Sequence, residues 1–247
     1  MASRSTLLVV TLGCTLGFGS TAVAQTPTGP LPQETRIVAN AKGVVIGVHG
    51  GSWLLTGSET LMAGPRPALA RWRAAGWSTV NIDYRPGRAA LADIRAAVRA
   101  ARRTARRVCL YGESAGGHMA LLVATQVKVD CVQTVGAPTD LPALPAGDTR
   151  HAAEVTFGTR LATFSPARKR STTPTLVAHA RHDDVVPHSQ SRLPRWPHAQ
   201  RLSLSPGPHR SVHGGISSRS LRAMREAETS LRARLQVAVA GSAAGLE

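Results

Sequence analysis

The sequence is short of aromatic, acidic and cysteine residues. Only 4% of its 247 residues are aromatic, and 14 Asp and Glu face 30 Lys and Arg, for a formal net charge of +16. A basic chain raises the question of nucleic-acid binding. No nucleic-acid-binding motif is present, however, and aromatic residues are scarce. We therefore expect no specific nucleic-acid partner, and at most a weak attraction to anionic envelope polymers or membranes.

Metal-ligand spacing is also missing. The nine histidines include no H-E-x-x-H and no paired metal-ligand pattern, so we expect no metal and no other cofactor. No internal repeat is found, and beyond the N-terminus no apolar run is long enough to cross a bilayer. The length and the 43% hydrophobic content fit one globular domain, expected at 41–240.

The excess positive charge is mostly arginine, because only three of the basic residues are lysine. Much of it falls within one predicted amphipathic helix at 89–106, whose apolar residues recur at steps of three and four. The simplest interpretation places these arginines on the solvated face of that helix: Arg95, Arg99, Arg102, Arg103, Arg106 and Arg107.

The N-terminus has the features of a secretory signal peptide at 1–24. Arg4 precedes an apolar stretch at 6–18, and Ala22-Val23-Ala24 fits an A-x-A cleavage site. The stretch is short for a membrane anchor, and a lipoprotein signal around Cys14 is the other alternative. We expect a secreted or periplasmic protein with a polar lead-in at 25–40.

Two cysteines remain after such cleavage. Cys109 and Cys131 each open an apolar run of strand length, and consecutive strands of a parallel sheet are often neighbours. Export would put both in an oxidising compartment. A Cys109–Cys131 disulfide is predicted, and the alternative is two buried thiols that pack as small hydrophobes.

Apolar strand-length runs alternate with helical patterns along the chain. This alternation predicts an α/β fold with a mostly parallel, doubly wound sheet and helices on both faces. The pattern breaks down at 141–173, where prolines and glycines predict a short, loop-rich cap insertion with one short helix.

A nucleophile motif lies at the centre of the chain. Gly112-Glu113-Ser114-Ala115-Gly116 reads G-x-S-x-G and stands between a predicted strand and a predicted helix. In that context the serine occupies a sharp turn with its hydroxyl exposed at the carboxyl edge of the sheet, and a Cβ on the glycines would collide with the strand and helix. Ser114 is therefore the candidate nucleophile.

Further motifs follow the other predicted strands: H-G-G-S-W at 49–53, D-Y-R at 83–85, an Asp before V-V-P at 183–187, and a late histidine. Together with G-E-S-A-G-G they resemble the α/β-hydrolase superfamily, and within it bacterial esterases/lipases and prolyl-oligopeptidase-type hydrolases. The resemblance covers about 40–237. It implies the α/β-hydrolase fold and a Ser-His-Asp triad in chain order Ser, Asp, His.

The resemblance favours Asp183 over its neighbour Asp184 as the triad acid, and Asp184 is then a turn or cap residue. The base is His213 or His209. We prefer His213, which stands in a glycine turn before the predicted last helix, while Gly207-Pro208-His209 resembles the G-x-H ending of relatives.

By the same resemblance, the backbone N–H groups of Gly51, Ser52 and Ala115 form an oxyanion hole. Trp53 is expected to wall the acyl pocket, and His49 to shape the glycine loop. Four other polar residues are interpreted as structural: Glu113 supports the nucleophile turn, Asp83 and Asp140 hold loops, and His118 packs behind the nucleophile.

These expectations describe a secreted serine hydrolase of the carboxylesterase type (EC 3.1.1) that acts on a small-molecule ester. The short cap suggests short-chain acyl esters. Two alternatives stay open: a prolyl-oligopeptidase-type serine peptidase, and a catalytically silent, basic cell-envelope binding protein with the same fold.

Overall fold

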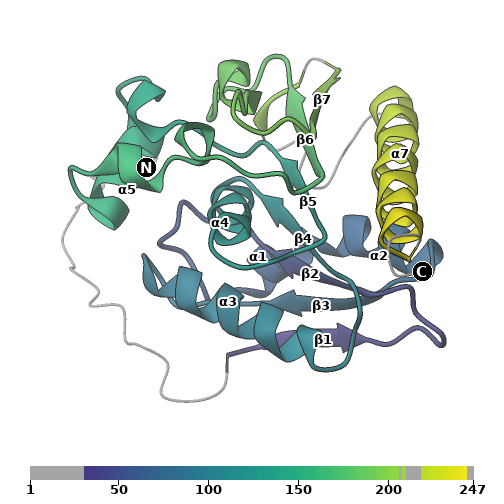
Figure 1. Cartoon of the computed structure of the whole chain (residues 1–247). Coiled ribbons are helices and arrows are strands. Elements are labelled where there is room, and N and C mark those ends of the chain that lie inside the picture. The colour runs from purple at the N-terminus through teal and green to yellow at the C-terminus, as the bar shows by residue number, and fades with distance from the viewer. Residues whose placement is uncertain (1–30, 206, 210–217, 244–247) are drawn as a thin grey trace, which may run out of the picture.

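The computed structural model describes residues 31–205, 207–209 and 218–243. Its centre is a seven-stranded sheet of order β1-β3-β2-β4-β5-β6-β7 (Figure 1). All neighbouring strands are parallel except the β1/β3 pair at one edge. The strands are β1 (Gln33–Arg36), β2 (Val44–Val48), β3 (Ser78–Ile82), β4 (Val108–Glu113), β5 (Cys131–Val135), β6 (Thr175–Ala180) and β7 (Ala199–Leu204).

Helices connect the strands and cover both faces of the sheet (Figure 1). The amphipathic helix predicted for 89–106 is present as α3 and ends four residues early. The helices are α1 (Glu59–Ala63), α2 (Arg66–Ala74), α3 (Ala89–Arg102), α4 (Ala115–Ala124), α5 (Asp148–Phe157) and α7 (Ser218–Ala243). Short 3-10 turns are η1 (Leu141–Ala143), η2 (Leu161–Phe164), η3 (Pro166–Arg168) and η4 (His188–Ser191).

The central strand β4 shows how the two faces separate the core. Val108 and Leu110 lie in one buried cluster with residues of α3 and α4, whereas Cys109 and Tyr111 lie in the other, with residues of α2 and α7. Alternation along the strand sends side chains to opposite faces. Because helices cover both faces, every residue of β4 is buried, which explains why the sequence reads as a continuous apolar run.

The predicted Cys109–Cys131 disulfide is present. β4 and β5 are parallel neighbours, and their register puts Cys109 directly opposite Cys131. Their Cα atoms are 4.6 Å apart, and the two sulfurs are bonded. The bridge therefore links the strand before Ser114 to the next strand of the sheet.

The domain begins earlier than predicted. Residues Gln33–Arg36, assigned from sequence to the lead-in at 25–40, form β1 and pair antiparallel with β3. β1 is an edge strand held by backbone hydrogen bonds, and most of its side chains are exposed, so it carries no apolar pattern to reveal it. The predicted signal peptide at 1–24 lies outside the described residues.

The cap insertion at 141–173 contains one α-helix, α5, and three 3-10 turns. The first turn of α5 contacts the loop after β6, where the Thr149 hydroxyl donates to the Val185 carbonyl at 3.1 Å. The cap is thus attached beside the carboxyl edge of the sheet. In the described part of the chain, no helix combines the length and apolar character needed to cross a bilayer.

Candidate active site

Ser114 occupies the turn between β4 and α4. Its backbone has φ 49° and ψ −123°, a region that non-glycine residues rarely adopt and that marks functional sites. The turn is held from the neighbouring strand, because the Ser114 N–H donates to the Val135 carbonyl at 2.9 Å. This geometry directs the hydroxyl away from the sheet, toward solvent at its carboxyl edge.

The glycines around Ser114 are required by the packing. A Cβ on Gly112 would lie 2.6 Å from the Gly116 carbonyl oxygen, and one on Gly116 would overlap the carbonyl oxygens of Val48 and His49. The sequence expectation that side chains here would collide with the neighbouring strand and helix is confirmed. Only glycine lets β4, β2 and α4 meet this closely.

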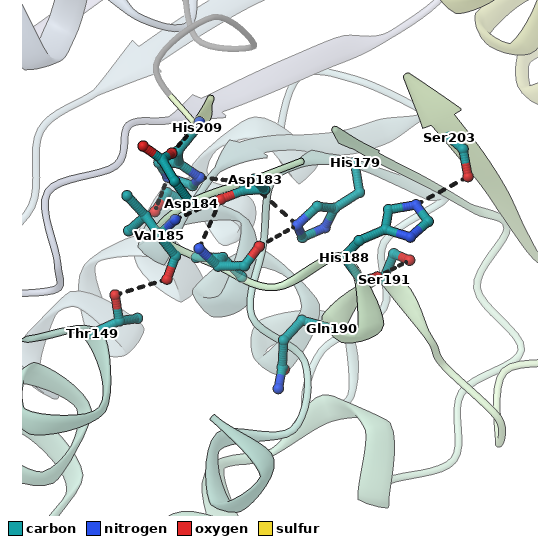
Figure 2. Close-up of polar contacts among 12 residues, drawn as sticks. Thr149, His179, Asp183, Asp184, Val185, His188, Gln190, Ser191, Ser203 and His209 are labelled. Carbon is teal, nitrogen blue, oxygen red and sulfur yellow. Dashed lines mark hydrogen bonds and ion pairs between the residues drawn. The ribbon is translucent and has the colours of Figure 1, made fainter. Parts of the chain in front are cut away.

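His209 joins Ser114 to Asp183. Its Nε2 is 3.0 Å from the Ser114 hydroxyl oxygen, and its Nδ1 is 2.8 Å from Asp183 Oδ2. Figure 2 shows the imidazole directed at the aspartate. With Nδ1–H donating to the carboxylate, Nε2 is left as the acceptor for the serine proton. This is the tautomer that a general base needs.

The position predicted first for the base, His213, lies outside the described residues. The alternative from the sequence, His209, is the histidine that the structure brings to both Ser114 and Asp183.

Asp183 is held by three hydrogen bonds and a nearby histidine. Oδ1 accepts the N–H groups of Val185 and Val186, and Oδ2 accepts His209 Nδ1–H. His179 Nε2, which bonds to the Val186 carbonyl, lies 3.3 Å from Oδ2. Burial by itself would raise the pKa of this carboxyl, but the donors outweigh it and hold the pKa below the usual range. Asp183 is therefore a carboxylate at neutral pH, suited to orient an imidazole and to stabilise its charged form.

Asp184 acts on the same histidine through its backbone. Its Oδ1 accepts the His209 backbone N–H at 2.7 Å, as Figure 2 shows. Two consecutive aspartates thus hold His209, one by the ring and one by the main chain. Sequence analysis assigned Asp184 only a turn or cap role, because nothing in the sequence links it to a residue 25 positions later.

Gly136 leaves space for the imidazole. It follows β5 with φ 59°, and a Cβ there would lie 3.0 Å from His209 Cε1. Both facts favour glycine at this position. The sequence signal for this role is a glycine directly after a predicted strand.

The glycine loop at 49–53 is held by the D-Y-R segment. His49 Nε2–H donates to Asp83 Oδ1 at 2.9 Å, and its ring stacks on Tyr84 with centroids 4.3 Å apart. The Tyr84 hydroxyl donates toward the carbonyls of His49 and Gly50, at 2.8 and 3.0 Å. The expected roles of His49 in shaping this loop and of Asp83 in holding it are confirmed, and Tyr84 is added to them.

The glycine loop that carries two of the expected oxyanion donors approaches the nucleophile at Gly50. Gly51, Ser52 and Trp53 all have positive φ, and a Cβ on the preceding Gly50 would stand 3.3 Å from Ser114 Cβ. In the described part of the chain, the N–H groups of Gly51 and Ser52 have no backbone or side-chain acceptor. Ala115 begins α4, so its N–H has no acceptor within that helix.

Trp53 is a core residue. Its side chain is 0% exposed, and its indole N–H donates to His118 Nδ1 at 3.0 Å. Contrary to the expectation from the sequence, it therefore does not line an open acyl pocket. Its ring makes an edge contact with Phe157 of the cap. His118 Nε2–H in turn donates to the Phe164 carbonyl at 2.7 Å, and burial lowers the pKa of His118 to about 4. The expected packing role of His118 is confirmed.

The remaining polar residues are structural, as expected. Glu113 is buried and accepts the Tyr111 hydroxyl at 2.7 Å. Asp140 pairs with Arg168 of the cap at 2.7 Å. Among the residues that the structure describes, no three His, Cys, Asp or Glu side chains are grouped so as to hold a metal ion.

Known proteins share this architecture. Residues 32–143 match the BD-FAE family model. Esterase 2 of Thermogutta terrifontis with bound butyrate superposes with a TM-score of 0.65 at 18% identity, over 83% of this chain and 89% of that one. The chain has the α/β-hydrolase fold.

Other solved structures share this fold. The Thermogutta terrifontis esterase phosphonylated by sarin has a TM-score of 0.65 at 17% identity, over 80% of this chain and 87% of that one. Est1E of Butyrivibrio proteoclasticus with bound ferulic acid has a TM-score of 0.60 at 17% identity, over 84% of this chain and 96% of that one. No curated protein sequence matches this chain.

Proposed function

We propose that this protein is a secreted serine esterase that cleaves short-chain carboxylic esters, with Ser114 as nucleophile, His209 as base and Asp183 as acid. The observation that carries the proposal is the hydrogen-bonded chain from the Ser114 hydroxyl through His209 to the Asp183 carboxylate. A serine hydroxyl becomes a competent nucleophile when a base can take its proton.

In the acylation step, Ser114 Oγ attacks the ester carbonyl carbon while His209 Nε2 takes the hydroxyl proton. The carbonyl oxygen becomes an oxyanion, for which Gly51, Ser52 and Ala115 offer backbone N–H donors. When the tetrahedral intermediate collapses, the bond to the alcohol oxygen breaks. His209 then gives its proton to that oxygen, and the alcohol leaves.

In the deacylation step, water attacks the Ser114 acyl ester and His209 takes a proton from it. The second tetrahedral intermediate collapses to a carboxylic acid, and the serine recovers its proton from His209. Asp183 stays ionised throughout and stabilises the imidazolium each time it forms.

The solved structures that share this fold support an ester substrate. They include esterases with bound butyrate and with bound ferulic acid. A cap of one α-helix and three short turns leaves little material for a large lid, which favours an open site and small acyl groups. Export is proposed from the signal-peptide pattern, and the Cys109–Cys131 disulfide fits an oxidising compartment.

The test is to measure initial rates on p-nitrophenyl acetate, butyrate and octanoate for the wild type and for Ser114→Ala. We expect turnover that is fastest on the shorter esters and falls by more than about 10³-fold in the variant. One of the similar esterases is phosphonylated by sarin, so a fluorophosphonate reagent should label the wild type and not Ser114→Ala.

Three results would overturn the proposal. Equal turnover by Ser114→Ala would remove the nucleophile assignment. Cleavage of peptides at rates above those of esters would favour the peptidase alternative. No turnover and no phosphonate labelling of a folded wild type would favour the silent binding protein.

A further inference from the structure

A set of cations at the amino edge of the sheet lacks acidic partners. Arg99 lies on α3, and Arg103, Arg106 and Arg107 follow on the segment from α3 to β4. None of these four arginines forms an ion pair with a carboxylate of the described residues. Arg102, which lies between Arg99 and Arg103 in the sequence, does pair with Asp130. Lys42 is exposed, and its ammonium group donates to the Ala75 carbonyl and to no carboxylate of the described residues. Neighbouring like charges without counter-charges create a positive surface potential.

These cations line two hollows. Lys42, Arg106 and Arg107 line a hollow of about 590 Å³ beside the first residues of β2 and β3. Arg99 and Arg103 line a second hollow of about 510 Å³ between α3 and the β1 edge. Asp83 and Asp93 also line it, but they are engaged by His49 and Arg85. We call these five cations the basic surface. Arg103, at the second hollow, and Arg106, at the first, are three residues apart in one connecting segment.

An exposed apolar side chain stands within the same surface. Ile37 lines the first hollow with Lys42 and Arg107. It is 78% exposed, more than any other large hydrophobic residue in the described chain. An anionic polymer in water would neutralise the arginines but would give Ile37 nothing to bury against. A bilayer with anionic headgroups offers both a negative surface and hydrocarbon.

We propose that the basic surface is a peripheral docking site for an anionic phospholipid bilayer, with Ile37 inserted at the headgroup level. The arginines would lie against the lipid phosphates, and each cation near such a surface strengthens binding by about fivefold. Salt should weaken the attraction, because the charges are exposed.

Docking in this way leaves the active site open. The second hollow borders the end of β3, which β2 separates from β4. The first hollow lies where β2 and β3 begin, and Ser114 follows the end of the parallel strand β4. The two are at opposite edges of one sheet, as the separation of the β1–β2 connection from α4 and α5 in Figure 1 illustrates. A bound bilayer would therefore hold the hydrolase with Ser114 facing away from the lipid.

The test is sedimentation of the exported chain with vesicles of phosphatidylcholine containing about one-third phosphatidylglycerol, with pure phosphatidylcholine vesicles as reference. The surface variant carries R99Q, R103Q, R106Q and R107Q. A matched control loses the same charge from exposed arginines elsewhere that also lack an ion pair: R160Q, R170Q, R192Q and R225Q. Activity on a soluble ester checks that both variants are folded.

We expect the wild type to bind the anionic vesicles and not the neutral ones, and binding to fall as salt rises. The surface variant should lose more than about 100-fold in partition coefficient, and the control less than about tenfold. Ile37→Ser should lose about three- to tenfold. In all variants the activity on the soluble ester should be unchanged.

Two outcomes would overturn the proposal. Equal losses in the surface variant and the control would mean that net charge, and not this surface, drives binding. Retention on immobilised polyglutamate or duplex DNA as strong as on vesicles, with Ile37→Ser unaffected, would identify a polyanion as the partner instead of a bilayer.

Discussion

Ser114 and the glycine loop are positioned by backbone packing, whereas His209 is positioned by carboxylates from another segment. On the first side, Gly112 and Gly116 let three chain segments meet at distances that exclude a Cβ. On the second side, Asp183 and Asp184 hold the ring and the main chain of His209. The position of Ser114 therefore depends on the absence of side chains at the glycines. The position of His209 depends on the presence of carboxylate acceptors.

This difference explains which parts of the site could be predicted. Close backbone approach leaves a local signature, since a glycine at a fixed spacing from Ser114 is visible in the sequence. The choice between His209 and His213 has no local signature, because both follow the last strand. It depends on contacts with Asp183, 26 residues earlier in the chain.

The fold shows the same contrast. Strands buried on both faces, such as β4 and β5, are continuous apolar runs and were predicted within a few residues. The edge strand β1 was missed, because polar side chains in solvent carry no pattern. The burial of Trp53 could not be predicted either, since it depends on His118 and the cap lying against the glycine loop.

The largest expected effect comes from the acid side, in Asp183→Asn. An amide there would leave Nδ1 of His209 without its carboxylate and favour the tautomer whose Nε2 carries a hydrogen, which cannot accept the serine proton. We expect kcat on p-nitrophenyl acetate to fall by about 10⁴-fold.

The neighbouring Asp184→Asn is the matched control. Its amide oxygen can still accept the His209 backbone N–H, so we expect kcat within about threefold of the wild type. Similar rates for the two variants would mean that Asp183 does not orient the base.

The next largest effect is expected for Gly51→Ala, which tests the role of the glycine loop as an oxyanion donor. Gly51 has φ 123°, and a Cβ would lie 2.8 Å from the Leu55 carbonyl oxygen, so the loop must shift. Losing a well-placed oxyanion donor costs about 10² to 10³ in kcat, and we expect a loss in that range with the circular dichroism spectrum unchanged.

Gly57→Ala is the control for backbone strain. Gly57 also has positive φ, 71°, but nothing lies within 4 Å of its added Cβ. It should cost about 1–2 kcal/mol of stability and little kcat. An equal loss of kcat in both variants would contradict the oxyanion assignment.

A smaller effect, on stability, concerns His118, which accepts the hydrogen bond of the Trp53 indole N–H. Burial lowers the pKa of His118 to about 4, so below about pH 6.5 the unfolded chain takes up a proton there that the folded chain does not. The free energy of unfolding should therefore fall as pH drops from about 6.5 to 4, by roughly 3 kcal/mol from this group.

Urea unfolding at both ends of that range measures the effect. His118→Leu should be less stable at neutral pH and should lose less stability on acidification than the wild type. His198→Gln, at an exposed histidine, should behave as the wild type does. The same acid-induced loss in His118→Leu and the wild type would show that His118 is not the group responsible.

The most direct test of the account compares kcat for His209→Ala and His213→Ala, each made alone, on p-nitrophenyl acetate. The contacts of His209 with Ser114 and Asp183 predict a loss of more than about 10³-fold for His209→Ala and near wild-type turnover for His213→Ala. The opposite pattern, with His209→Ala active and His213→Ala inactive, would contradict the proposed triad.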